Sequence, residues 1–412
     1  MRIFHRRRPV TRIGPAKPTA HCRCQWHAHN HYTQAVTAPP AKAIDWHAFL
    51  ARPRLPAPSA QTLDQLRDSS ILVTGAGGSI GSALSLRLAA LRPKRLLLLD
   101  ASEQALNRLQ VALEGAGYLD RARLLLGNCN NPSLLDEILK DEQTQLIFHA
   151  AAYKHVPMLE QHPIEAIANN ALATLALAGA VARAGTARIV LLSTDKAAAP
   201  VSILGATKRI AERIVLTHNG VALRLGNVLC TEGSASEIFT RQIDAGVPIT
   251  VTTEDAERYF LTCAEAVDLL LASAIKAPAR SLLAPQLPHR HRITQLASFL
   301  SNELSPGRKP AIVFTGQRSG DKHREVFWSS DEDASASVID GLLKITQRQG
   351  EDLLSPHSLD SLGDAVRERN LGLAMASTRS LVPNYIVGET VLDRLILDSL
   401  ILNQLTQCEV RR

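Results

Sequence analysis

Cysteine is scarce in this sequence, and that scarcity excludes one class of protein. Six Cys occur among 412 residues, too few for a secreted domain held together by many disulfides. Two of them, Cys22 and Cys24, lie among histidines, but a structural zinc site needs a different spacing and a second pair of ligands. We therefore predict no metal site, reduced cysteines and a cytoplasmic location.

Long apolar runs are also missing. The longest nearly apolar stretch, residues 171–182, has twelve residues, whereas a helix that crosses a membrane needs about 20. The basic residues Arg6, Arg7 and Arg8 are not followed by an apolar run, so the N-terminus does not have the pattern of a secretory signal. The sequence therefore predicts no integral membrane segment.

Acidic residues are almost absent from the first 60 positions. Asp45 is the one acid there, against ten Lys or Arg, and the same stretch holds eight Pro and six His. Because the rest of the chain is nearly neutral, the basic charge belongs to an arm rather than to a folded surface, and we predict no nucleic-acid partner. We expect residues 1–60 to be a flexible arm and residues 401–412 to be a tail.

What the sequence does have is an alternation of short apolar runs with helical patterns. The predicted strands are residues 71–73, 96–99, 124–126, 146–148 and 189–192. The predicted helices between them are residues 82–91, 102–114, 133–140 and 164–184. Buried strands separated by helices predict an α/β fold with a doubly wound parallel sheet over residues 65–226. Residues 227–400 alternate less regularly, and we expect a smaller α+β substrate region there.

A glycine triplet marks the first turn of this sheet. Gly75, Gly78 and Gly81 stand between the first strand and the first helix. The first glycine permits a tight turn, the second lets the backbone approach a pyrophosphate, and the third lets the helix pack closely on the strand. The amides of Ser79 and Ile80 then open the helix, where its positive dipole end favours phosphate.

The residue at the end of the second strand distinguishes a cofactor site from a merely tight turn. Asp100 lies 25 residues after Gly75, where a carboxylate can bind the ribose hydroxyls of a dinucleotide and repel a 2′-phosphate. We therefore predict that the chain binds NAD, with NADP as the alternative.

Further motifs carry a resemblance to a known family. They occupy residues 149–157, 193–196, 205–209, 225–229, 258–260 and 265–267, with weaker echoes at 320–322 and 381–385. Over about residues 70–390 the chain resembles extended short-chain dehydrogenases. Most closely it resembles the capsular-polysaccharide biosynthesis family, whose members include nucleotide-sugar 4,6-dehydratases acting on UDP-N-acetylglucosamine. Many relatives also carry a membrane-spanning N-terminal half.

The resemblance implies a reaction with three stages. Bound NAD takes hydride from C4 of a UDP-sugar, and the resulting ketone acidifies the proton on C5. A base removes that proton while an acid protonates the departing C6 hydroxyl, and the hydride then returns to C6. The resemblance assigns the acid to Asp195 and the base to Lys196, whose pKa Lys208 would lower as a neighbouring cation. Thr194 would bind the C4 hydroxyl, and Lys208 would also bind the nicotinamide ribose.

The family's remaining positions imply two more groups of residues. Cofactor contacts are expected from Asn128, Ala150, Ala151 and Ala152, and substrate contacts from Lys154, His155, Asn227 and Arg258. The alternative to a substrate contact for Lys154 and His155 is that they are ordinary charged residues at the start of a helix. For Arg258 the alternative is a surface role. We expect Asn170 to be structural, Glu212 and Arg213 to lie on a solvated helix face, and the protein to be a homo-oligomer.

One departure from the family affects the predicted chemistry. Leu204 stands four residues before Lys208, where short-chain dehydrogenases carry a Tyr that removes the C4 hydroxyl proton. Larger members of the family carry Met there. Asn128 also replaces an expected Asp, and Ala173 an expected Gly. The alternatives to a dehydratase are a nucleotide-sugar epimerase or dehydrogenase, and a non-catalytic paralogue that binds NAD.

Overall fold

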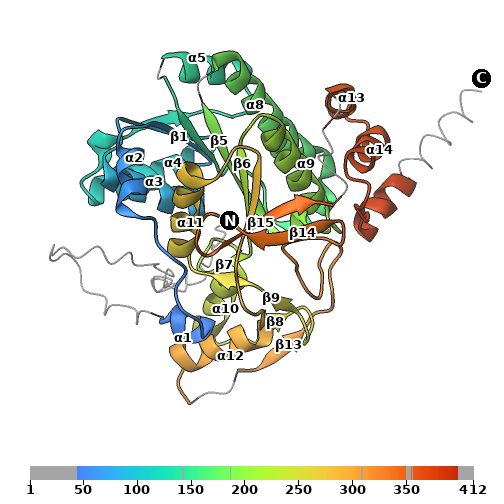
Figure 1. The fold of residues 1–412 in the computed structure, drawn as a ribbon. Coiled ribbons are helices and arrows are strands. Elements are labelled where there is room, and N and C mark those ends of the chain that lie inside the picture. The colour runs from blue at the N-terminus through green and yellow to red at the C-terminus, as the bar shows by residue number, and fades with distance from the viewer. Residues whose placement is uncertain are drawn as a thin grey trace, which may run out of the picture.

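The computed structural model describes residues 44–397, apart from residues 142, 186, 308–309, 349–353 and 355. Helices cover both faces of a large central sheet, and a smaller lobe lies below it (Figure 1). Residues 1–43, with Cys22 and Cys24, and the predicted tail lie outside the described residues.

The central sheet has nine strands in the order β14-β15-β11-β6-β5-β4-β1-β2-β3. In chain order they are β1 (Ser70–Thr74), β2 (Arg95–Asp100), β3 (Arg123–Leu126), β4 (Leu146–His149), β5 (Arg188–Thr194), β6 (Val221–Leu225), β11 (Ser281–Pro285), β14 (Glu332–Ala336) and β15 (Leu342–Gln347). All pairs from β3 to β11 are parallel, whereas β15 and β14 add antiparallel. The doubly wound sheet is confirmed, and its strand order reverses between β1 and β4, where such folds bind ligands.

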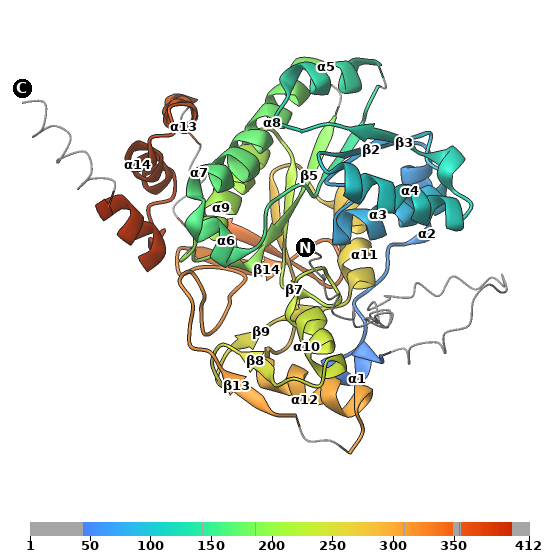
Figure 2. The same cartoon turned by 180° about the vertical axis from the view of Figure 1, so that it is seen from behind.

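Helices pack on the two faces because successive strand residues point in opposite directions. Ile71 and Val73 of β1 join the core beneath α3 (Ser79–Leu91), α4 (Glu103–Gly115) and α11 (Cys263–Lys276), with α2 (Ala60–Arg67) beside them. Leu72 joins the opposite core, beneath α5 (Pro132–Asp141), α8 (Ala173–Ala184) and α9 (Ile203–Thr217). Figure 2 shows the second face, where α13 (Pro356–Arg367) and α14 (Leu371–Leu381) lie outside α7 (Pro163–Ala166) and α9.

The smaller lobe is built from short strand pairs and two helices. It contains β7 (Asn227–Val228) with β10 (Phe260–Leu261), β8 (Ile249–Val251) with β13 (Ile312–Phe314), β9 (Glu257–Arg258) with β12 (His291–Arg292), α10 (Ala235–Asp244) and α12 (Ile293–Leu304). Its own core includes Phe239, Phe260 and Leu296. Residues 227–400 are nevertheless not one separate unit, since α11, β11, β14 and β15 return to the large sheet.

The predicted flexible arm is wrong for residues 44–60. Asp45 caps the short helix α1 (Trp46–Leu50), whose Phe49 and Leu50 are buried. Arg52 then donates two hydrogen bonds, of 2.7 and 2.9 Å, to the Glu265 carboxylate at the start of α11. Averaging the composition over 60 residues concealed this local apolar cluster.

The stretch Pro163–Ala184 corrects the reading of apolar runs. It consists of α7 (Pro163–Ala166), a π-helical segment (Ile167–Leu172) and α8. By length and composition its 22 residues are enough to cross a membrane, since an 18-residue window within them has a mean hydropathy of 1.4. However, 61% of that window is buried inside the protein. Because the stretch packs beside α5 and α9, we interpret it as a core helix.

Candidate active site

The glycine loop crosses the end of β4 at very close range. Gly75 has a φ of +67°, and a Cβ there would lie 2.6 Å from the backbone of Ala151. A Cβ on Gly81 would lie 1.9 Å from the Gly75 carbonyl oxygen. Gly78, the residue before α3, provides no side-chain cap. The first amides of α3, at Ser79 and Ile80, have no partner within the helix and can therefore act as donors to an anion.

Asp100 is held beside this loop by the backbone. Its Oδ2 accepts a hydrogen bond from the Gly77 amide and its Oδ1 from the Ser102 amide, both at 2.8 Å. The carboxylate therefore faces the glycine loop with lone pairs to spare. Asn128 lies at the end of the adjacent strand β3 and is exposed, with Oδ1 accepting from the Asn130 amide at 2.8 Å. The residues predicted to bind a dinucleotide thus share one edge of the sheet, together with Ala150, Ala151 and Ala152 after β4.

The predicted acid–base pair follows β5 at the same edge. Asp195 and Lys196 open a short 3-10 helix (Asp195–Ala197), and Lys196 Nζ lies 3.0 Å from Asp195 Oδ1. The Thr194 hydroxyl donates to the same Oδ1 at 3.0 Å. Asp195 is fully buried, and its Oδ2 has no hydrogen-bond partner among the described residues. The structure therefore brings Thr194, Asp195 and Lys196 into direct contact.

A second carboxylate, which sequence reasoning missed, reaches this pair from the C-terminal part of the chain. Glu325 Oε1 lies 3.7 Å from Lys196 Nζ, and Glu325 Oε2 lies 3.0 Å from Lys322 Nζ. Glu325 is 2% exposed. We call Asp195, Lys196, Lys322 and Glu325 the acid–base cluster. The weak motif at residues 320–322 was the one signal in the sequence that pointed to this segment.

Burial and the neighbouring charges set the proton affinities in this cluster. Burial raises the pKa of Asp195, and the nearby Glu325 raises it further, against the opposing effect of Lys196. Burial alone would lower the pKa of Lys196, but Asp195 and Glu325 together raise it. The prediction that Lys208 lowers this pKa is therefore wrong, because the two carboxylates dominate. Burial would raise the pKa of Glu325, whereas Lys196, Lys322 and Arg258 lower it.

Lys208 is a buried residue of α9. It is 4% exposed, and burial lowers its pKa to about 8, against the opposing charge of Glu212. Burial, with the charge of Lys208 in addition, also lowers the pKa of His149 to about 3. The neutral His149 ring shares hydrogen bonds with Thr74 at 2.6 Å and Thr174 at 3.0 Å. One turn before Lys208, Leu204 is 5% exposed and belongs to the hydrophobic core.

The predicted substrate residues divide into two groups. Lys154 and His155 are exposed after β4, and the His155 ring lies against Gly233, where a Cβ would approach it to 2.3 Å. Asn227 is half-buried in β7. The Arg258 guanidinium is instead used within the protein, since it donates to the carbonyl oxygens of residues 257, 322 and 323 at 2.8, 2.8 and 3.0 Å. It thereby holds the segment that carries Lys322 and Glu325.

Asn170 has the structural role that the sequence predicted. Its side chain accepts from the Tyr153 amide at 2.8 Å and donates to the Tyr153 carbonyl at 3.1 Å. It also donates to the Thr207 hydroxyl at 3.3 Å. Asn170 therefore fixes the loop after β4 to α9.

A second set of buried charges lies directly behind the acid–base cluster. Arg224 makes five hydrogen bonds of 2.7–2.9 Å: two to Glu212, two to Glu332 and one to the Phe327 carbonyl. Arg209 also pairs with Glu332 and, at 3.5 Å, with Glu212. We call these four residues the Arg224 cluster. The predicted solvated position of Glu212 is wrong because this ion pairing buries it.

Arg213 is not fully solvated either, since it is half-buried and donates to the Leu381 carbonyl.

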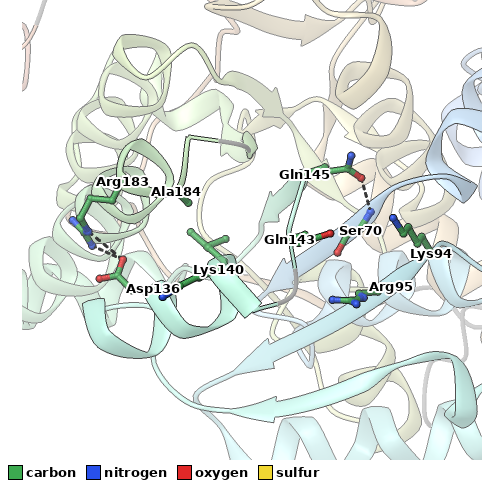
Figure 3. Close-up of a pocket in the computed structure, with 10 residues that line it drawn as sticks. Ser70, Lys94, Arg95, Asp136, Lys140, Gln143, Gln145, Arg183 and Ala184 are labelled. Atoms are coloured by element: carbon green, nitrogen blue, oxygen red, sulfur yellow. Dashed lines mark hydrogen bonds and ion pairs between the residues drawn. The ribbon is translucent and has the colours of Figure 1, made fainter.

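A pocket of about 920 Å³ lies elsewhere on the molecule. Figure 3 shows its lining residues, among them Ser70, Arg95 and Gln145 near the amino ends of strands, and the Asp136–Arg183 ion pair at 2.8 Å. Because the glycine loop and the acid–base cluster occupy the carboxyl ends of the strands, this pocket is at the opposite edge of the sheet.

A doubly wound sheet with this glycine loop and Asp100 defines a Rossmann-type α/β protein. Within that class, residues 71–347 match the family described as "Polysaccharide biosynthesis protein", and the chain belongs to this family. It is 33% identical to "Probable polysaccharide biosynthesis protein EpsC" of Bacillus subtilis (strain 168), over 72% of this chain and 51% of that protein. It is 34% identical to "Capsular polysaccharide biosynthesis protein CapD" of Staphylococcus aureus, over 71% of this chain and 50% of that protein. The chain thus spans about half the length of these curated relatives.

Other similarities extend to nucleotide-sugar enzymes. A UDP-glucose 4-epimerase of Rickettsia prowazekii (strain Madrid E) is 28% identical over 69% of this chain and 85% of its own. Among solved structures, Pen from Bacillus thuringiensis is 24% identical, with a TM-score of 0.64 over 70% of this chain and 93% of its own. MoeE5 in complex with UDP-glucose and NAD is 26% identical, with a TM-score of 0.50 over 61% of this chain and 87% of its own.

Proposed function

We propose that this protein is a nucleotide-sugar 4,6-dehydratase that uses bound NAD on a UDP-N-acetylglucosamine-like substrate in surface-polysaccharide biosynthesis. Membership of the polysaccharide biosynthesis family supports the substrate class. The observation that carries the proposal is the Asp195–Lys196 pair, 3.0 Å apart at the carboxyl end of β5. An elimination across C5 and C6 needs an acid and a base within a few ångströms, and an epimerase does not.

The residues present fit NAD. Only glycine can occupy positions 75 and 81, because a Cβ at either would meet backbone atoms within 2.6 Å. Ser79 and Ile80 would hold the pyrophosphate through their amides, Asp100 the adenosine ribose, and Lys208 the nicotinamide ribose. When bound, NAD supplies reversible acceptance of a hydride. MoeE5, which was solved with NAD, shares this fold.

Thr194 and Asp195 provide a path for the proton of the C4 hydroxyl. The Thr194 hydroxyl donates to Asp195 at 3.0 Å and accepts from the Lys196 amide at 3.4 Å, which leaves one lone pair for the substrate. As C4 is oxidised, its hydroxyl proton passes to Thr194 while the Thr194 proton passes to Asp195. Asp195 then gives this proton to the departing C6 hydroxyl, which leaves as water. This path does the work of the Tyr that short-chain dehydrogenases carry at the position of Leu204.

Lys196 supplies the complementary step at C5. Its neutral amine takes the C5 proton, exchanges protons with the solvent, and later returns a proton to C5 when C6 has become a methyl group. Protonation of Asp195 removes one of the two negative charges that raise the Lys196 pKa. The Lys196 pKa therefore falls at the stage at which Lys196 must act as a base.

Two alternatives remain distinct from this proposal. Similarity to a UDP-glucose 4-epimerase favours epimerisation, which needs the C4 chemistry but no acid at C6. The buried Leu204 favours a non-catalytic paralogue that binds NAD. A cytoplasmic location and a homo-oligomeric state stay predictions.

One experiment separates these functions. The protein is incubated with NAD and UDP-N-acetylglucosamine in deuterated water, and the sugar is analysed by mass spectrometry and NMR. A dehydratase yields a 4-keto-6-deoxy sugar that has lost water and carries deuterium at C5. An epimerase yields an isomer of unchanged mass without deuterium. If every UDP- and dTDP-hexose tested stays unchanged while NAD binds, the paralogue replaces the dehydratase.

Asp100 provides a test of the cofactor. Because its carboxylate repels a 2′-phosphate, we expect the wild type to bind NAD more tightly than NADP. Asp100→Ala should weaken NAD binding and relieve the discrimination against NADP, as measured by calorimetric titration of both cofactors. A wild type that already prefers NADP would contradict this assignment.

A further inference from the structure

Glu325 is a buried carboxylate that the mechanism above does not use. Its side chain is 2% exposed, on a segment that connects the smaller lobe to β14. Burying a carboxylate is costly unless cations and donors surround it. Here Lys322 lies 3.0 Å from one of its oxygens and Lys196 lies 3.7 Å from the other. Glu325 thus connects the C-terminal part of the chain to the predicted base.

The backbone that carries Glu325 is fixed from several sides. Arg290 Nε donates to the Glu325 carbonyl at 2.8 Å, and the Arg290 guanidinium lies over the Tyr259 ring at 4.6 Å. Tyr259 in turn stacks on Phe327 at 4.7 Å. Arg258 holds the carbonyls of Lys322 and of residue 323. Anchors on both sides of residue 325 keep its carboxylate at the end of β5.

The charged groups that face Glu325 define what its charge can act on. They are Asp195 and Lys196 after β5, Lys322 on its own segment, and Arg258 from β9, with Arg290 at its carbonyl. Among the described residues, Asp195 and Glu325 are the two carboxylates within ion-pair distance of Lys196. When Asp195 carries a proton, Glu325 is therefore the charged partner that remains for Lys196.

We propose that Glu325 is a positioning residue for the Asp195–Lys196 pair, whose carboxylate holds the Lys196 side chain in the site while Asp195 exchanges its proton. The proton exchange rests on the proposed dehydratase function, whereas the hold on Lys196 does not. A tether for the loop alone would need Lys322 but would not affect Lys196. The chemical reactivity of Lys196 therefore distinguishes positioning from tethering.

The test compares Glu325→Gln with the wild type and with Glu257→Gln. Glu257 pairs with Arg324 of the same segment at 3.0 Å and stands outside the acid–base cluster. Each protein is trace-labelled with acetic anhydride across a range of pH, without substrate, and acetylation of Lys196 is quantified by peptide mass spectrometry. Removing the Glu325 charge should lower the Lys196 pKa, because a carboxylate favours the ammonium. A drop of one pKa unit gives about tenfold more labelling at pH 8.

Turnover provides the second readout in the same proteins. We expect Glu325→Gln to lower kcat about tenfold, to move the pH profile of kcat to lower pH, and to leave KM nearly unchanged. Glu325→Asp, which keeps the charge, should restore part of kcat and part of the pH profile. It also provides a variant for the test if Glu325→Gln does not fold. Glu257→Gln should match the wild type.

The outcomes separate this proposal from the proposed function. Unchanged Lys196 labelling and an unmoved pH profile in folded Glu325 variants would overturn the positioning role. If the wild type converts no nucleotide sugar, the dehydratase fails, and the labelling still decides whether Glu325 holds Lys196.

Discussion

The acid–base cluster and the Arg224 cluster are built from the same kinds of residue but differ in how completely they are satisfied. Each contains two carboxylates and two cations, and each takes one carboxylate from the segment between residues 325 and 332. Neighbouring residues of β5 serve both: the Ser193 hydroxyl donates to Glu212 at 2.5 Å, and Thr194 donates to Asp195. The strand alternation places one cluster behind the other.

The difference lies in what each cluster leaves open. Arg224 is fully buried, and five hydrogen bonds occupy its guanidinium donors. In the acid–base cluster, Asp195 Oδ2 has no hydrogen-bond partner among the described residues, and the Lys196 side chain is 21% exposed. A completed set of ion pairs resists proton transfer, whereas an incomplete set keeps groups that a substrate can use. We therefore expect changes in one cluster to affect stability and changes in the other to affect turnover.

The largest effect is expected on turnover. Asp195→Asn and Lys196→Ala each remove one partner of a proton transfer, and such groups contribute about 10²–10⁴-fold. Each variant should lose that much kcat while NAD binding, measured by calorimetry, stays close to wild type. Loss of NAD binding in step with turnover would show that the pair shapes the cofactor site instead.

The next effect is expected on stability. Arg224→Met removes the cation that makes four hydrogen bonds to Glu212 and Glu332 and leaves them with Arg209 alone, and breaking a buried pair costs about 3–5 kcal/mol. Urea unfolding at pH 7 measures this loss. The matched control is Arg348→Met, because Arg348 pairs with Asp333 at the surface, where a pair contributes about 0–1 kcal/mol. Equal losses in the two variants would remove the distinction between the clusters.

Acid should weaken the Arg224 cluster. Although burial opposes it, Arg224 lowers the pKa of Glu332 from 4.5 to about 2. The stabilisation is therefore complete above pH 4.5 and is lost as pH falls toward 2, and at 1.36 kcal/mol per unit it amounts to about 3 kcal/mol. Urea unfolding between pH 7 and pH 3 should show about 2 kcal/mol of this loss, and Glu332→Gln should reduce the slope of stability against pH. The buried Asp195, whose pKa is raised, changes the stability with pH in the opposite direction, because its ionisation at higher pH disfavours the folded state.

The smallest effect is expected at Leu204, which belongs to neither cluster. Leu204→Met conserves volume in the core, so stability should change by less than about 1.5 kcal/mol, and kcat should stay within about twofold of wild type. Leu204→Tyr places a phenol one turn from Lys208, and we expect faster C4 oxidation, followed as reduced cofactor in a single turnover. A large loss of kcat in Leu204→Met would contradict the path through Thr194.

The resemblance to a known family assigned one half of the acid–base cluster, Asp195 and Lys196, and local patterns were enough to predict the edge of the sheet on which they lie. The glycine loop, Asp100 and the Thr194–Lys196 segment each follow a strand whose apolar run is evident in the sequence, and parallel strands end at one edge. Glu325 was not predictable in this way, because it lies 129 positions after Lys196 and reaches it through the segment that precedes the antiparallel strand β14. The arrangement depends on tertiary contacts that no local pattern records.

Glu212 shows why a charged residue on a helix was misread. On sequence alone, an acid beside a base in a helix is typical of a solvated face. Its burial depends on Arg224, twelve residues later, and on Glu332, which neutralises the excess positive charge. The short apolar cluster of α1 was concealed for a different reason, since its neighbours are rich in proline and basic residues.

The separation of 108 residues between Arg224 and Glu332 also has a consequence for protein synthesis. At about 5–20 residues per second, a ribosome needs on the order of 5–20 s to pass from one to the other. During that interval the emerging chain already holds the glycine loop and six parallel strands, with Glu212 as the only one of the two acids available to Arg224. The sheet is complete only when β14 and β15 have been synthesised. Glu332 is the first residue of β14, and Glu325 lies just before that strand. The edge that carries the glycine loop is thus made first, and the residues that complete the acid–base cluster are made last.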